Sequence, residues 1–170
     1  MGAKKSGGGK LSRSETVSVR LDPKLRFAAE LAARRHRRTL SSFVEWAVEE
    51  AVNKINVAHL SDDVPPETAF DVMSRVWDVD EADRFAKLAM SFPMLLTHDE
   101  DKLWKLICEC GYFWKGAYNK RKWSWTVSMK SLVFDRLRER WWLLNKIVNG
   151  EADKSDLPKI PDESYDDSPF

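Results

Sequence analysis

The sequence has few of the residues that mark a secreted, membrane or zinc-binding protein. Its 170 residues include two cysteines, Cys108 and Cys110, which are too few for a disulfide framework and lack the second pair that a structural zinc site needs. No stretch approaches the roughly 20 apolar residues that span a bilayer, and the N-terminus lacks the apolar run of a signal peptide. We therefore expect reduced thiols with a packing role, no membrane partner and a cytoplasmic protein.

Residues that would carry catalysis are also scarce. The three histidines, His36, His59 and His98, are scattered, and the glycine triplet at 7–9 does not follow a strand as a phosphate-binding loop does. His98 directly precedes the acidic residues Asp99, Glu100 and Asp101, a cluster more typical of a helix N-terminus than of a metal site. The sequence predicts no enzymatic activity, no metal ion and no cofactor.

Charge is balanced over the whole chain but not along it. The formal net charge is +1, yet residues 1–58 hold 12 basic and 6 acidic side chains, residues 59–150 hold 14 of each, and residues 151–170 hold 2 and 7. Such asymmetry indicates a polyanionic partner for the basic end. The acidic tail would be either a solvated terminus or a competitor for that basic end.

Composition divides the chain into a flexible basic arm, an N-terminal domain, a linker, an all-α domain and a disordered acidic tail. The linker is placed by Pro65-Pro66, through which no helix continues. The expected fold class is mainly α. The five segments are residues 1–14, 15–56, 57–66, 67–150 and 151–170.

The N-terminal domain is expected to contain one strand followed by two helices. Residues 16–21 alternate polar and apolar with period two, which predicts a half-buried strand. Asp22-Pro23 predicts the start of a first helix, and Thr39 predicts the cap of a second, after a polar break at 37–39. Since a single strand cannot satisfy its own backbone groups, it needs a partner, most economically the same strand of a second copy.

Residues 15–48, ETVSVRLDPKLRFAAELAARRHRRTLSSFVEWAV, resemble the first part of a ribbon-helix-helix domain of the MetJ/Arc type, and the resemblance extends to about residue 52. It depends on a strand that ends in Arg-Leu-Asp-Pro, a helix of about four turns, a short basic break and a second helix opened by Thr-Leu-Ser-Ser. The resemblance implies a homodimer or higher homo-oligomer whose antiparallel ribbon enters the major groove of double-stranded DNA. A transcriptional repressor is the implied function.

The resemblance also implies roles for single residues. Thr16, Ser18 and Arg20 would contact base edges, Arg20 most selectively because a guanidinium can bind two atoms of guanine; the alternative is that they only face solvent. The backbone N–H groups of Thr39, Leu40 and Ser41 would bind a phosphate, and we expect further phosphate contacts from Arg38, Lys4, Lys5, Lys10 and Arg13. The dimer core would consist of Val17, Val19, Leu21, Leu40, Phe43, Val44 and Ala47.

Two features depart from the family's pattern. A glycine commonly ends the first helix, whereas here Arg37 stands in the basic run 34–38, so one residue there must adopt a left-handed conformation or the helix ends differently. We expect this run to lie near DNA phosphates rather than to be only a solvated turn. Phe27, Leu31 and Trp46 fall where polar surface is usual, and we expect them to dock against the second domain or a neighbouring dimer.

Residues 67–150 resemble no family that we can name. Helices are expected at 67–77, 80–91, 98–114 and 128–149, the third opened by the capping box Thr97-x-x-Glu100. Aromatic and basic residues alternate in the unassigned stretch 112–127; they could stack on nucleic-acid bases, but an aromatic core with a basic rim is the stronger interpretation. Trp141-Trp142 predicts one buried ring and one near a surface.

The alternative function is an adaptor. Similar folds serve as antitoxins and as plasmid partition or DNA-transfer accessory proteins, in which the C-terminal part binds a protein partner. A usual antitoxin carries a short disordered segment there, whereas residues 67–150 are expected to be folded, which disfavours that option.

Overall fold

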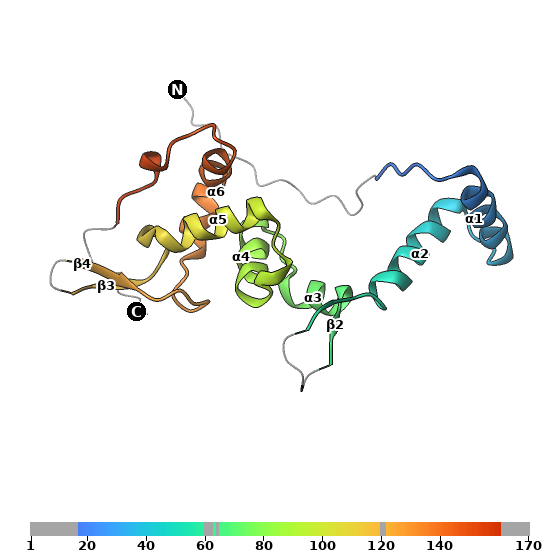
Figure 1. Ribbon diagram of the computed structural model, residues 1–170, viewed down its shortest axis with the longest axis horizontal. Helices are drawn as coiled ribbons and strands as arrows, with labels where there is room; N and C mark the ends of the chain where they lie inside the picture. The colour runs from blue at the N-terminus through green and yellow to red at the C-terminus, as the bar shows by residue number, and fades with distance from the viewer. Residues whose placement is uncertain (1–16, 60–62, 64, 120–121, 161–170) are drawn as a thin grey trace, which may run out of the picture. The chain divides into compact units, whose positions relative to one another are not determined.

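The computed structural model describes residues 17–59, 63, 65–119 and 122–160. These residues are mainly helical, with six α-helices and two small antiparallel strand pairs (Figure 1). They belong to two compact units, Met1–Asn53 and Lys54–Phe170, hereafter unit 1 and unit 2. The boundary precedes the expected linker at 57–66, because residues 56–58 pair with a strand of unit 2.

Unit 1 contains the two helices that the sequence predicts. Helix α1 spans Pro23–Arg35 and helix α2 spans Leu40–Val52. The Asp22 carboxylate accepts a hydrogen bond from the Lys24 N–H (2.9 Å), and the Thr39 hydroxyl accepts one from the Ser42 N–H (3.2 Å). Both caps satisfy N–H groups that the first helical turn leaves unpaired.

The expected strand at 16–21 is not formed within one chain. Residues 17–22 have no regular secondary structure, and Thr16 lies outside the described residues, as do the arm residues Lys4, Lys5, Lys10 and Arg13. A β-strand is defined by its hydrogen bonds to a neighbouring strand. No other described segment of unit 1 is a strand that could pair with residues 17–22.

Arg37 adopts a left-handed conformation, the first of the two alternatives that the missing glycine leaves open. Its φ is +54°, and it is the one non-glycine residue with positive φ in the part of the chain that the structure describes. The Arg37 N–H donates to the Arg34 carbonyl (3.1 Å) and the Arg38 N–H to the Ala33 carbonyl (2.9 Å). These are the two hydrogen bonds of a Schellman motif, so arginine occupies the place that usually favours glycine.

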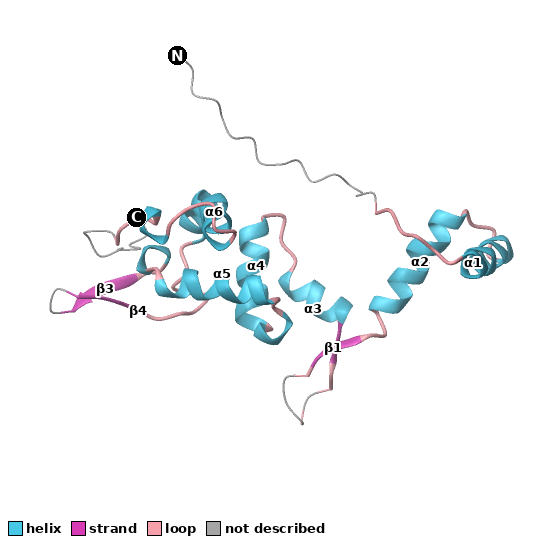
Figure 2. Cartoon of the chain, turned by 45° about the horizontal axis from the view of Figure 1, so that its top comes forward, coloured by secondary structure: helices cyan, strands magenta, loops and turns pink. Residues whose placement is uncertain are grey.

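Unit 2 was expected to be all-α, but it includes two strand pairs. Figure 2 shows the β3–β4 hairpin beside the helices. In chain order the elements are β1 (Asn56–Ala58), β2 (Glu67–Thr68), α3 (Ala69–Val76), α4 (Glu81–Ser91), η1 (Pro93–Leu95), α5 (His98–Glu109), η2 (Gly111–Phe113), β3 (Gly116–Asn119), β4 (Lys122–Trp125), α6 (Phe134–Val148) and η3 (Lys154–Asp156).

The helix bounds of unit 2 differ from the expectation where polar side chains fix the backbone. The helix expected at 67–77 begins at Ala69, since Thr68 and Asp71 form a capping box. The helix expected at 128–149 begins at Phe134, because hydroxyl hydrogen bonds between Ser128 and Ser131 hold a turn before it. The helix expected at 80–91 is confirmed with Asp80 as its cap, and the Thr97–Glu100 capping box is confirmed.

Two indole N–H groups pair with carbonyls in the last turn of α5, which ends at Glu109 rather than at the expected residue 114, and a third pairs with a carbonyl of η2. Trp114 donates to the Ile107 carbonyl (2.9 Å), Trp125 to the Cys108 carbonyl (3.1 Å) and Trp123 to the Gly111 carbonyl (3.2 Å). The last carbonyls of a helix lack partners inside the helix, and a buried indole needs an acceptor. The indole N–H groups therefore gain acceptors, and the carbonyls at the end of α5 gain donors.

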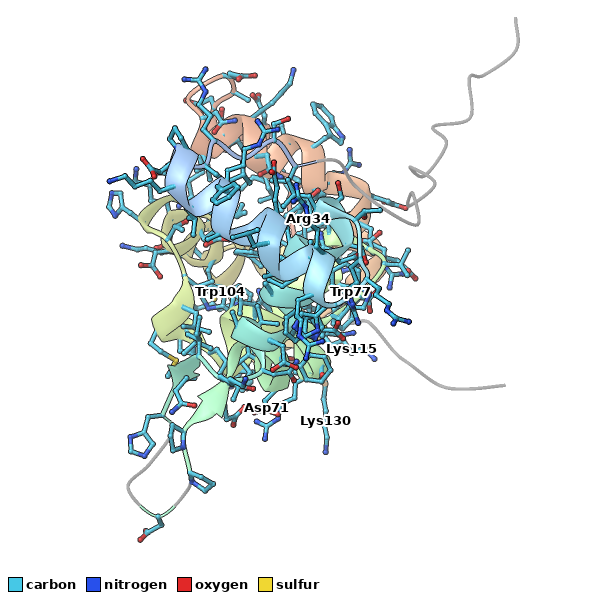
Figure 3. The ribbon with its side chains drawn as sticks, turned by 90° about the vertical axis from the view of Figure 1, so that its right-hand side faces the viewer. Arg34, Asp71, Trp77, Trp104, Lys115 and Lys130 are labelled. Atoms are coloured by element: carbon cyan, nitrogen blue, oxygen red, sulfur yellow. The ribbon has the colours of Figure 1, made fainter. Side chains whose placement is uncertain are left out.

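The aromatic residues of 112–125 mostly form core, which confirms the stronger interpretation. Phe113 and Trp114 are fully buried and Trp123 is nearly so, whereas Tyr118 is exposed. Trp104, labelled in Figure 3, packs edge-on against Trp114. The Trp141-Trp142 expectation is confirmed in part: Trp141 is half-buried and packs on Phe85, with 5.3 Å between ring centroids, and Trp142 is exposed.

The expected disorder of residues 151–170 is wrong for the first part of that tail. Lys154 and its neighbours form the short η3 helix, the Lys154 ammonium lies 2.6 Å from the Glu109 carboxylate, and Leu157 packs against the core. An apolar anchor and an ion pair order a segment that composition alone makes polar. Residues 161–170 lie outside the described residues.

An ion pair joins α4 to α6. The Asp83 carboxylate is buried and accepts two hydrogen bonds from the Arg138 guanidinium, at 2.9 and 2.5 Å. Arg138 also donates to Asp135, whose carboxylate is 87% exposed. Arg138 thus has one buried and one solvated partner. The effects of substituting the two aspartates can therefore be compared directly.

We predict that Asp83→Ala lowers the free energy of unfolding of unit 2 by about 2 kcal/mol, because Arg138 loses its buried partner but can still reach solvent. Urea unfolding followed by tryptophan fluorescence measures this change, since seven of the eight tryptophans lie in unit 2. Asp135→Ala should change the free energy by less than about 0.5 kcal/mol. Equal losses in the two variants would contradict the assignment of the buried pair.

We predict that Arg37→Gly raises the stability of unit 1 by about 0.5 to 1 kcal/mol, because glycine adopts positive φ without a steric cost. Thermal unfolding followed by circular dichroism measures it. Arg37→Ala removes the same charge but keeps the Cβ, so its stability should stay near that of the wild type. Equal stabilisation by Gly and Ala would instead trace the effect to charge repulsion within residues 34–38.

Candidate nucleic-acid interface

The candidate interface lies on unit 1, where the residues expected to contact DNA precede α1 or lie between the helices. Ser18 and Arg20 are exposed. Arg20 lines a hollow together with Val19, Leu21, Arg26 and Leu40, so the segment 17–22 lies against both helices. Both described polar residues of this segment, Ser18 and Arg20, are therefore accessible to a ligand.

None of the seven residues expected in the dimer core is buried within one chain. Val17 and Val19 are 79% and 66% exposed, and Leu21, Leu40, Phe43, Val44 and Ala47 are half-buried. On α2 the last four lie on one side of the helix, since positions three and four apart share a face. An apolar face made by α2 and residues 17–21 is thus left uncovered in the single chain.

The N-terminus of α2 presents unpaired donors. The Ser42 N–H is satisfied by Thr39, and the Phe43 N–H donates to the Thr39 carbonyl (2.9 Å). Among the described residues no acceptor pairs with the N–H of Leu40 or Ser41, and the first turn carries no acidic side chain. Two adjacent amides at the positive end of a helix dipole suit an anion.

The basic run beside this helix end is exposed. Arg34, labelled in Figure 3, and Arg35, Arg37 and Arg38 form no ion pair within the ranges that the structure describes. Four guanidinium groups within five residues produce a positive potential next to the free amides of α2. Such a potential attracts phosphates and is screened by salt.

Trp46, which the sequence suggests as a docking residue, packs partly against its own unit. It is half-buried, and its ring lies 5.3 Å from the His36 ring and 5.6 Å from the Phe43 ring, centroid to centroid. The Arg38 guanidinium carbon lies 5.6 Å from the Trp46 centroid. Phe27 and Leu31, by contrast, are 58% and 48% exposed, so unit 1 itself leaves them uncovered.

The contact between Arg38 and Trp46 was missed by reasoning from the sequence. The sequence feature that could have revealed this contact is the position of Trp46 on α2, about 120° around the helix axis from Leu40. A large ring at that angle lies at the edge of the apolar face and not at its centre. It can therefore reach the loop that precedes the helix.

The described part of unit 2 contains no candidate metal site. In residues 54–59, 63, 65–119 and 122–160, and equally in the described part of unit 1, no group of three His, Cys, Asp or Glu side chains could hold a metal ion. Burial raises the pKa of the Cys108 thiol to about 11, so it stays protonated near neutral pH. Cys108 and Cys110 are unbridged and pack at the core, as expected.

Within the described residues, no helix is both long and apolar enough to cross a bilayer. No protein-family model, curated protein or solved structure matches the chain.

Proposed function

We propose that the protein is a homodimeric, sequence-specific DNA-binding regulator, most simply a transcriptional repressor, whose residues 15–52 form a ribbon-helix-helix domain. The observation that carries this proposal is the lack of a core in unit 1. Among its described residues only Ala33 is buried, although two helices of 13 residues each pack together there. Isolated helices of this length are marginal in water, so the pair needs more burial than one chain supplies.

A second copy would supply that burial. Pairing of residues 16–21 across a two-fold axis would form an antiparallel ribbon, with Val17, Val19 and Leu21 turned toward the open face of α2. The alternation of side chains then turns Thr16, Ser18 and Arg20 to the other side. A two-stranded ribbon fits the DNA major groove, which gives Arg20 access to guanine.

The remaining features of unit 1 are suited to the DNA backbone. The free N–H groups of Leu40 and Ser41 and the exposed Arg38 would bind phosphates on either side of the ribbon. The arm residues Lys4, Lys5, Lys10 and Arg13 would add contacts that do not depend on sequence. No step of this function requires a catalytic group or a cofactor.

Unit 2 would contribute a protein–protein surface. On α3 the side chains of Phe70 and Met73 are 41% and 39% exposed and, three residues apart, share one face of the helix, and Trp77, the residue that directly follows α3, is 55% exposed. Large apolar side chains gathered on one exposed face favour an oligomer contact or a protein partner. The same surface supports the second candidate function, an adaptor whose unit 2 binds another protein.

We predict that Val19→Lys abolishes the dimer, because it places a charge on the apolar side of the ribbon. Ser18→Lys places the same charge one residue earlier, on the opposite side, and should leave the dimer intact. Sedimentation equilibrium of the full-length variants distinguishes the two. Dimers of equal stability in both variants would exclude the ribbon as the dimer contact.

The proposed function is tested by selecting bound sites from random duplex DNA. Two-fold symmetry predicts paired half-sites. Arg20→Ala should cost about 1 to 3 kcal/mol of discrimination at particular base pairs, whereas Lys4→Ala with Lys5→Ala should weaken all sequences alike and reduce the salt dependence. Selection of no sequence would favour the adaptor, and a uniform effect of Arg20→Ala would exclude base contact by the ribbon.

A further inference from the structure

Trp46 is the residue of unit 1 whose surroundings the resemblance does not explain. It lies at the edge of the apolar face of α2, and its ring contacts the loop before that helix. His36, Phe43 and the Arg38 guanidinium all lie within about 6 Å of its centroid. A tryptophan ring has a negative face, which attracts a guanidinium placed over it.

The backbone of Arg38 is held by the turn that precedes α2, and its guanidinium lies over the Trp46 ring. Arg37 turns the chain through a left-handed conformation, and the Arg38 N–H donates to the Ala33 carbonyl (2.9 Å). Arg38 directly precedes the helix cap, Thr39. Its Cα is thus held close to the two unpaired N–H groups at the start of α2, and the ring of Trp46 limits where its guanidinium can go.

Among the basic residues of the loop, Arg38 is distinguished by this support. Arg34, Arg35 and Arg37 contact no aromatic ring within the described residues. An arginine free in solvent loses side-chain entropy when it binds a phosphate, whereas one already held in place loses less. A guanidinium stacked on a ring keeps its N–H edge available for a phosphate.

We propose that Trp46 is a positioning residue for DNA binding. Its ring holds the Arg38 guanidinium beside the N–H groups of Leu40 and Ser41, so that one DNA phosphate is bound by two amides and one arginine. Trp46 itself does not contact DNA. The inference rests on the proposed function, because it requires the α2 N-terminus to bind the DNA backbone.

The test measures the affinity of the full-length protein for its selected duplex. The substitutions distinguish loss of the aromatic ring from loss of an apolar side chain. Trp46→Leu keeps an apolar side chain but removes the aromatic ring. It should weaken binding about 4- to 25-fold, since both protomers of a dimer are affected and the contact in each changes binding about 2- to 5-fold. Trp46→Phe keeps a ring face and should weaken binding clearly less. Neither variant should change the dimer in sedimentation equilibrium.

A double-mutant cycle shows whether Trp46 acts through Arg38. In the Arg38→Ala background, Trp46→Leu should cause no further decrease in affinity. The slope of log K against log salt should fall by about 0.9 for each phosphate that Arg38→Ala leaves without its cation, and Trp46→Leu should move the slope toward that value. A general decrease in folded protein would weaken binding equally at all salt concentrations.

The outcomes separate the two proposals. If the wild type binds DNA and Trp46→Leu binds equally well, or weakens binding as much with Arg38→Ala as without it, then Trp46 is not a positioning residue. If Trp46→Leu fails to fold, the comparison of Trp46→Phe with the wild type, with and without Arg38, decides the same question. If the wild type selects and binds no duplex, the proposed function fails, and the inference fails with it.

Discussion

The α1–α2 pair has too little buried surface to be stable alone, and the features of unit 1 depend on that constraint. The one buried side chain among its described residues is the methyl group of Ala33, which contributes about 1 kcal/mol at most. Ordering each residue of two helices costs a comparable amount. In the proposed dimer, folding and association of this unit would therefore be one process.

The loop between the helices combines backbone strain with concentrated charge. A left-handed arginine costs stability that glycine would not, and four neighbouring guanidinium groups repel one another. Strained residues are often found where function needs a fixed geometry. Here the strained residue lies between the C-terminus of α1 and the unpaired amides of α2, so the least stable part of the loop is also the part with the highest positive charge.

Local sequence signals predicted the helix starts well. They did not predict structure that depends on contacts between residues far apart in the sequence. Asp22-Pro23, Thr39, Asp80 and Thr97-x-x-Glu100 each start a helix as expected, since a cap acts within one turn. The β3–β4 hairpin was not predicted, because its turn lacks the Asn-Gly or Asp-Gly signal of tight hairpins. The contact of Trp46 with Arg38 was missed for the same kind of reason: it depends on how a loop returns to a helix eight residues later.

The tryptophan hydrogen bonds at the end of α5 have a consequence for how unit 2 folds. Each indole donates to a carbonyl 7, 12 or 17 residues earlier in the chain, and Gly111 lies so close that an added Cβ would be 2.7 Å from the Trp123 ring. These are short separations, so little loop entropy is lost in forming them. Segment 107–125 can therefore assemble early and rapidly, before the Asp83–Arg138 pair, whose residues are 55 positions apart, closes α4 against α6.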